Sequence, residues 1–307
     1  MTPAEARTTP RPWFRSATFY RGVLAGLWRG LARDDCAGMA AAVAYHFIFS
    51  FFAGFFFLAC LATQFGQSHN NLVWILDVLS NFLPPQGIQL ARDNIDRFMR
   101  PVAREALPLA LVLSLWTASN VVEMVMKALN RIYSIAETRP AWLTRLGSLA
   151  IVLMVALFFL LAFNMQVFGD EIRRVIQANL DPHNFMARFI GSIRWPMIML
   201  ASTVAPLVIY FLAPNFRRGR RRVTWPGALF FALAWHFLNY FFNIFMDHFA
   251  DFDRVYGPLG TAMAVLTWVY MSALLLLVGG ELNAQLARQL PRPRPREASG
   301  DTVAATG

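Results

Sequence analysis

The stretch LGSLAIVLMVALFFLLAFNMQVFG, residues 146–169, decides the fold class of this chain because it carries no charge over its whole length. A bilayer core of ~30 Å needs about 20 helical residues at ~1.5 Å each. Lipid offers backbone groups no hydrogen-bond partner, so such a run must be a helix, which pairs its own peptide groups. The segment is therefore predicted to cross a membrane.

Similar apolar runs occur on both sides of this stretch. The sequence predicts six spans, at about residues 37–65, 106–127, 146–169, 195–216, 223–246 and 255–280. The span at 106–127 is the least apolar because it includes Thr117 and Asn120, so we expect neighbouring helices to hold it in the membrane. The predicted fold is an all-α integral membrane protein, a bundle of six transmembrane helices in one domain over residues 34–290.

The segments outside the spans are predicted to be short. Residues 1–12 and 291–307 are polar tails that contain proline, and we expect them to be disordered. In residues 13–33, aromatic and leucine side chains alternate with arginines, which favours an amphipathic helix in the membrane interface; a basic arm that binds nucleic acid is the alternative. The outer loops 66–105 and 170–194 have amphipathic spacing that predicts short surface helices.

Composition favours a membrane-embedded chain over a soluble one. Hydrophobic residues make up 57% of the 307 positions and charged residues 15%, whereas ordinary globular proteins carry about 25% charged residues. A net charge of +10 would also suit a nucleic-acid-binding protein. The basic residues, however, gather in the gaps between spans, so the predicted partner is the lipid bilayer and not nucleic acid.

The distribution of basic residues predicts an orientation. With the N-terminus in the cytoplasm, 19 of the 28 Lys and Arg residues fall on the inner side, which is the positive-inside bias with both termini cytoplasmic. Short loops weigh most in this rule, and one of them holds five arginines. These are predicted to bind anionic lipid headgroups at the cytoplasmic face: Arg217, Arg218, Arg220, Arg221 and Arg222.

The two cysteines are predicted to lie on one helix. Cys36 and Cys60 would be ~36 Å apart along its axis, whereas a disulfide needs Cα atoms within ~7 Å. Neither cysteine has the spacing of a metal ligand, and no cofactor motif accompanies them. The sequence therefore predicts no metal site and no cofactor.

Polar side chains gather on one face of the second predicted span. Trp116, Asn120, Glu123, Lys127 and Asn130 share this face at helical spacing. One interpretation is a polar wall along a substrate path, with Glu123 as a proton or cation site. The other is an ion pair between Glu123 and Lys127, four residues apart, with Lys127 reaching the cytoplasm.

Further polar residues lie on the first and fifth spans. His46 and His236 fall ~14 Å and ~20 Å from the inner ends of their helices, near the middle third of the bilayer. They either face a shared cavity or join helices through hydrogen bonds worth about 0.6–2 kcal/mol. The candidate polar path between spans 1, 2 and 5 comprises His46, Ser50, Asn120, Glu123, His236, Asn239, Tyr240 and Asn243.

Several short motifs, taken in order, resemble the YihY/BrkB family of bacterial inner-membrane proteins. They extend from about Arg33 to Ala287 and comprise AAAVAY (40–45) with Ser50, Trp116 with ALNRIY (128–133), PN (214–215), PGA (226–228), YGPLG (256–260), WVY (268–270) and GGELN (279–283). The resemblance implies a six-helix protein of the bacterial inner membrane. The family is often labelled a virulence or serum-resistance factor, and an older ribonuclease label is thought mistaken.

The sequence favours a non-enzymatic function. It contains no P-loop, no nucleophile elbow and no dense His/Asp cluster with two-metal spacing, so no catalytic residue is assigned. The first hypothesis is a transporter, exporter or lipid-handling protein that uses the polar path. The second is a non-catalytic scaffold for envelope integrity or resistance to host factors. The oligomeric state, including a homo-oligomer, is left open.

Overall fold

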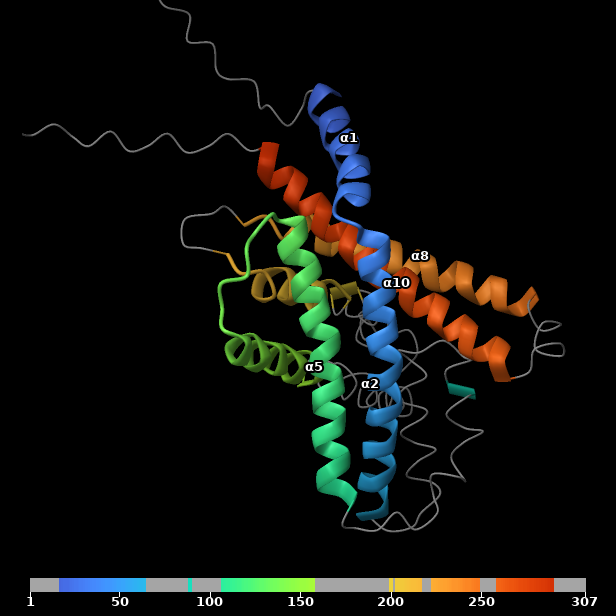
Figure 1. The fold of residues 1–307 in the computed structure, drawn as a ribbon. Helices are drawn as coiled ribbons and strands as arrows, with labels where there is room; N and C mark the ends of the chain where they lie inside the picture. The colour runs from blue at the N-terminus through green and yellow to red at the C-terminus, as the bar shows by residue number, and fades with distance from the viewer. Residues whose placement is uncertain are drawn as a thin grey trace, which may run out of the picture.

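A computed structural model shows an all-helical arrangement for the part of the chain that it describes, residues 17–64, 88–89, 106–157, 199–200, 202–216, 222–248 and 258–289. The helices labelled in Figure 1 are α1 (Ala17–Arg33), α2 (Cys36–Gln64), α5 (Ala106–Ile132), α8 (Trp225–His248) and α10 (Pro258–Gln289). Two shorter apolar helices cover Ala141–Leu157 and Ser202–Leu212.

Four of these helices, α2, α5, α8 and α10, are long and apolar enough to cross a membrane. They coincide with the predicted spans at 37–65, 106–127, 223–246 and 255–280. Large apolar side chains on their outer faces are exposed, for example Leu109 at 60% and Phe237 at 65%. Continuous exposed apolar surface of this kind suits lipid better than water.

The other two predicted spans are described in part. The helix Ala141–Leu157 contains the start of the span at 146–169, and the helix Ser202–Leu212 lies within the span at 195–216. Residues 199–200 and 213–216 of the second of these spans are also described, whereas 158–169, 195–198 and 201 lie outside the described ranges. The same is true of the two tails, of the outer loop 170–194 and of the loop 66–105 apart from Ile88 and Gln89.

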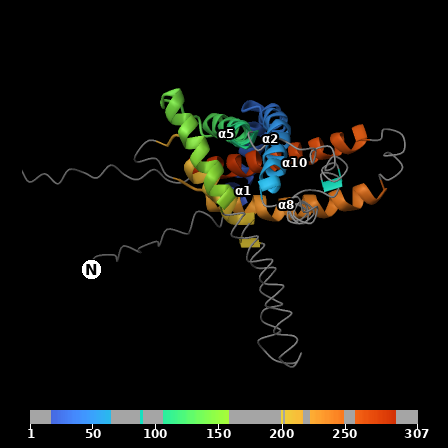
Figure 2. The same cartoon turned by 90° about the horizontal axis from the view of Figure 1, so that it is seen from below.

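Helices α2 and α5 lie side by side and run in opposite directions (Figure 1). Viewed along these two helices, α10 passes between the α2–α5 pair and α8 (Figure 2). The main core forms where these helices meet, from Ala40, Val43, Met126, Leu129 and Leu277. Helix α10 therefore joins all the long helices into one bundle.

A close backbone approach holds α8 against α10. Gly227 and Gly279 face one another, and a Cβ on Gly279 would lie 2.7 Å from the Gly227 carbonyl oxygen. Asn283 fixes the same contact because its Oδ1 accepts a hydrogen bond from the Gly227 N–H at 2.7 Å and its Nδ2 donates to the Thr224 carbonyl at 3.0 Å. Small residues allow this approach between membrane helices.

A row of glycines places α1 against the last turns of α10. Gly26 meets the Gln285 side chain, whose Nε2 donates to the Gly26 carbonyl at 3.1 Å. One turn away on either side, Gly30 faces Glu281 and Gly22 faces Gln289. The other side of α1 exposes Leu24 at 64% and Trp28 at 80%. The described helix covers residues 17–33 of the predicted segment 13–33.

Two residues with positive φ lie at helix boundaries, Asp35 between α1 and α2 and Ser134 after α5. Asp35, at φ 51°, separates α1 from α2, and its carboxylate accepts a hydrogen bond from the Gly38 N–H at 3.2 Å, so that it caps α2. Ser134, also at φ 51°, follows α5, where the Ile135 N–H donates to the Asn130 carbonyl. This hydrogen bond is typical of a helix C-terminus that closes in the left-handed region.

Candidate functional site

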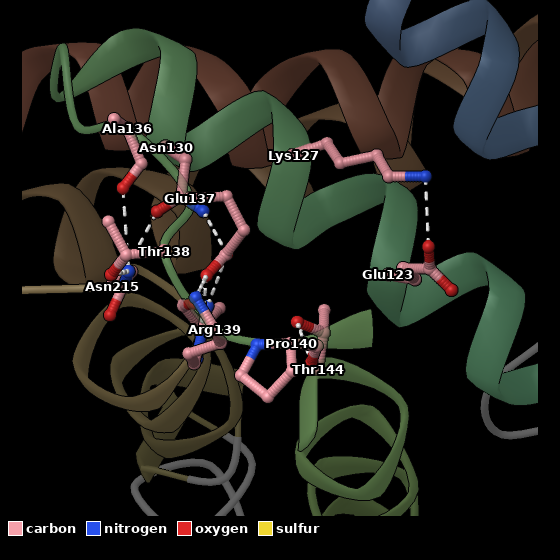
Figure 3. Close-up of polar contacts among 11 residues, drawn as sticks. Glu123, Lys127, Asn130, Ala136, Glu137, Thr138, Arg139, Pro140, Thr144 and Asn215 are labelled. Carbon is pink, nitrogen blue, oxygen red and sulfur yellow. Dashed lines mark hydrogen bonds and ion pairs between the residues drawn. The ribbon is translucent and has the colours of Figure 1, made fainter. Parts of the chain in front are cut away.

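The polar face of α5 holds its charged groups in ion pairs. Glu123 Oε1 lies 2.9 Å from Lys127 Nζ, four residues further along the helix (Figure 3). Its second oxygen, Oε2, accepts a hydrogen bond at 3.0 Å from Nη1 of Arg145, on the helix Ala141–Leu157. The predicted Glu123–Lys127 pair is therefore present, and it is one half of a larger cluster.

Arg145 is the residue of this cluster that sequence reasoning missed. Its Nη1 also donates to Asn120 Oδ1 at 2.6 Å, and its guanidinium carbon lies 3.8 Å from the centre of the Trp116 ring. The side chain is 21% exposed. Its Nη2 is buried and donates to no acceptor among the described residues. Two cations and one carboxylate leave this cluster with a net charge of +1.

A second polar network joins the last turn of α5 to the loop that leads to the next helix. Asn130 Nδ2 donates to Glu137 Oε2 at 2.7 Å, and Asn130 Oδ1 accepts from the Asn215 N–H at 2.8 Å (Figure 3). Arg139 binds both oxygens of Glu137, at 2.8 Å and 2.7 Å. Hydrogen bonding to Arg139 lowers the pKa of Glu137 to about 2. The network connects two sequence motifs, ALNRIY and PN, that are far apart in the chain.

Two of the four candidate polar residues of α8 pair with neighbouring helices. His236 Nε2 lies 3.1 Å from Ser202 Oγ, on the helix Ser202–Leu212. Asn239 Oδ1 accepts a hydrogen bond from Trp268 Nε1 of α10 at 2.8 Å. Tyr240 and Asn243, by contrast, are exposed. This face of α8 therefore divides into two groups that join helices and two that point outward.

The two candidate path residues of α2 lie about one helical turn apart. His46 and Ser50 are both half-buried, and the His46 ring packs edge-on against Tyr45 at 5.6 Å between ring centres. Within the described residues, His46 contacts Tyr45, whereas His236 contacts Trp235 and Ser202, so no contact joins the two histidines. A cavity shared by the two histidines thus stays a prediction.

A buried carboxylate on α10 was also missed as a site by sequence reasoning, although it lies in the GGELN motif. Glu281 is fully buried, and its Oε1 accepts a hydrogen bond from Gln285 Nε2 at 2.6 Å and lies 3.5 Å from Arg288 Nη1. Its Oε2 has no hydrogen-bond donor among the described residues. The only sequence signal was an acid at helical spacing from Gln285 and Arg288 near the end of an apolar run.

Of the five arginines predicted to bind lipid headgroups, the structure describes one, Arg222. Arg222 is exposed, and its guanidinium carbon lies 5.1 Å and 5.2 Å from the ring centres of Phe211 and Phe216. Arg217, Arg218, Arg220 and Arg221 lie outside the described residues. The described residues also contain no group of three His, Cys, Asp or Glu side chains that could hold a metal ion.

These observations define a helical membrane protein whose charged groups pair across helices in the C-terminal half of α5. The chain belongs to the family described as "Virulence factor BrkB", which matches residues 27–301. The resemblance seen in the sequence motifs is therefore confirmed.

Curated relatives extend over most of the chain. One is described as "Putative ribonuclease-like protein YfkH" of Bacillus subtilis, 27% identical over 83% of this chain and 92% of its own. Another is "UPF0761 membrane protein IL2447" of Idiomarina loihiensis, 25% identical over 76% of this chain and 78% of its own. No solved structure matches. The family and its relatives support a bacterial membrane protein.

Proposed function

We propose that this chain is a transporter, exporter or lipid-handling protein of the bacterial inner membrane, and not an enzyme. The observation that carries this proposal is the cluster in which Glu123 of α5 pairs with Lys127 and with Arg145 of a neighbouring helix. Charged residues within membrane helices are costly to insert, and they commonly mark substrate or ion pathways.

The proposed path follows polar groups on α2, α5 and α8. His46 and Ser50 belong to α2, Asn120 and Glu123 to α5, and the remaining candidates, His236, Asn239, Tyr240 and Asn243, to α8. Helix α10 packs against all three helices, and its Trp268 reaches Asn239, so the path would run along α10. Within this path, Glu123 and Arg145 are the groups proposed to meet the cargo.

We also propose the membrane topology of the whole chain. Six spans with both termini in the cytoplasm account for the four long helices, for the two shorter ones and for the placement of basic residues between them. The arginines of 217–222 would then contact anionic headgroups at the inner face, and no nucleic acid is needed as a partner.

Reconstitution of the full chain into liposomes tests the proposal. Flux of protons and of a fluorescent phospholipid is measured for the wild type, Glu123→Gln and His236→Ala. The matched control is Glu137→Gln, which alters an Arg-paired carboxylate in the loop and not in the membrane. We expect Glu123→Gln to lower flux about tenfold or more, as loss of a charge-assisted contact does, and the control to retain it. Unchanged flux in folded Glu123→Gln would remove this site from the proposal.

A non-catalytic scaffold is the second candidate function. The contacts Ser202–His236 and Trp268–Asn239 favour it, because they use polar groups to join helices. If the wild-type protein supports no flux of either cargo and its deletion still weakens the cell envelope, the scaffold is favoured and transport is excluded for these cargoes.

A further inference from the structure

We propose that Arg145, Lys127 and Trp116 form a binding site for a phosphate oxyanion beside the inner half of α5. This inference deepens the proposed function, on which it rests, by naming the chemical class of the cargo or of a bound lipid. It is argued from three features of the cluster: an unused donor, an excess positive charge and an adjoining apolar surface.

The first feature is the hydrogen-bonding capacity of Arg145. Its Nη1 is used twice, by Asn120 Oδ1 at 2.6 Å and by Glu123 Oε2 at 3.0 Å. Its Nη2 is buried and finds no acceptor within the described part of the chain. A buried charged donor without an acceptor is unfavourable, and the guanidinium fork matches phosphate oxygens in particular.

The second feature is charge. Glu123 binds Lys127 through one oxygen and Arg145 through the other, so the two cations lie within roughly 8 Å of each other, the sum of two hydrogen bonds and the carboxylate width. One carboxylate cannot neutralise both. The Lys127 side chain is 58% exposed and retains donors beyond the one that Glu123 accepts. An anion placed between the two cations would balance the cluster.

The third feature favours a lipid headgroup over free phosphate as the source of the anion. Trp116 stacks on the guanidinium group and is itself 59% exposed. Leu113, about one helical turn before Trp116, is 44% exposed, and Leu146, next to Arg145 in the sequence, is 57% exposed. They offer an apolar surface to acyl chains. Because Nη2 is covered in this conformation, the anion would reach it only after local movement, as in an occluded site.

Titration of the purified full chain in maltoside detergent, which contains no phosphate, tests the inference. Three titrants are compared: short-chain phosphatidylglycerol, diacylglycerol with the same acyl chains, and inorganic phosphate. We expect phosphatidylglycerol to bind and diacylglycerol to bind about tenfold more weakly or not at all. Binding of inorganic phosphate as well would identify free phosphate as a second source. Equal binding of diacylglycerol, or no binding of either phosphate compound, would overturn the inference.

Variants locate the site. Arg145→Gln should weaken phosphatidylglycerol binding about tenfold or more, and Arg145→Lys, which keeps the charge but loses the fork, should restore part of it. Arg131→Gln is the matched control, because Arg131 is an exposed arginine of the same helix α5 whose Nη2 donates to the Arg33 carbonyl, outside the cluster. If Arg145→Gln fails to fold, Lys127→Gln, on an exposed side chain, should still weaken binding. Equal losses in Arg131→Gln and the cluster variants would contradict the site.

The binding and flux measurements separate this inference from the proposed function. If phosphatidylglycerol binding depends on Arg145 but the protein supports no flux, the anion site is supported and the transport function is contradicted. Flux that depends on Glu123 without any binding of the phosphate compounds would retain transport and remove the anion site.

Discussion

Glu137 is a residue whose protonation should affect the loop between α5 and the next helix. Arg139 binds both of its oxygens, and Asn130 donates to one of them. These contacts lower its pKa from 4.5 to about 2. A lowered pKa in the folded state means that the contribution to stability is complete above the unfolded value and is lost as the pH falls toward about 2.

We therefore predict that Glu137→Gln is less stable than the wild type above pH ~5 and that the difference disappears between pH ~4.5 and ~2. Thermal unfolding in detergent across this pH range measures the difference. The double variant Glu137→Gln/Arg139→Gln should lose little more than either single variant, because the two residues share one interaction. A difference that does not depend on pH would contradict the assignment.

Asn283 is a buried amide that connects two helices. It is fully buried, accepts a hydrogen bond from the Gly227 N–H and donates to the Thr224 carbonyl. Asn283→Ala leaves both backbone groups without this partner, so we predict a loss of about 1–3 kcal/mol in the free energy of unfolding. Denaturant unfolding in mixed micelles measures it. Asn243→Ala, on an exposed part of α8, should cost less than about 0.5 kcal/mol.

At the scale of elements, the packing of α8 on α10 depends on the absence of side chains at two facing positions. A Cβ on Gly227 would clash with the Gly279 carbonyl oxygen, which belongs to the backbone and cannot rotate away. We predict that Gly227→Ala separates the helices and costs about 1–3 kcal/mol of unfolding free energy. The same micelle unfolding assay applies.

Gly54→Ala provides the matched control for this prediction. A Cβ at Gly54 would meet nothing within 4 Å. Because alanine favours helix over glycine by up to about 1 kcal/mol, Gly54→Ala should be neutral or stabilising. Equal destabilisation by the two substitutions would show that helix–helix contact does not explain the effect at Gly227.

The sequence predicts the apolar helices better than their ends. Charge-free runs located α2, α5, α8 and α10, because the width of the hydrocarbon layer sets span length locally. Helix ends depend on other contacts. α5 continues to Ile132, beyond the predicted limit at 127, until Ser134 adopts a positive φ. α10 continues to Gln289, beyond 280, because its polar last turns pack on the glycines of α1.

The candidate site, too, was predicted only where its contacts lie within one helix. The Glu123–Lys127 pair followed from spacing along one helix, and its ion pair is present. Arg145 was not predicted as its partner, because it is separated from Glu123 by 22 residues and only packing of two helices brings them together. Glu281 was placed in a motif, but its burial against Gly30 depends on the docking of α1 and has no signature in a single sequence.

At the scale of the whole molecule, the placement of basic residues predicts which ends of the helices face the cytoplasm. The loop between the helix Ser202–Leu212 and α8 contains five arginines, and basic residues in short loops are retained on the inner side. This orientation also places the Glu137 network and the last turns of α10 on that side.

We predict that a protease-cleavable tag inserted at Gly219, or fused to either terminus, is protected from protease added outside intact spheroplasts. The same tag inserted in 249–257 should be cleaved, because this segment joins α8 and α10 at their other ends. Permeabilised cells, in which every tag should be cleaved, provide the control. Cleavage at Gly219 in intact spheroplasts would reverse the orientation.

The two cysteines of α2 can report where the helix bundle first opens during unfolding. Cys36 and Cys60 are each 1% exposed and lie near opposite ends of the helix. An alkylating dye should therefore label neither position while the chain is intact. If one cysteine is labelled before the other during gradual denaturation, the helices separate first at the end of α2 that carries it. No engineered probe is needed for this measurement.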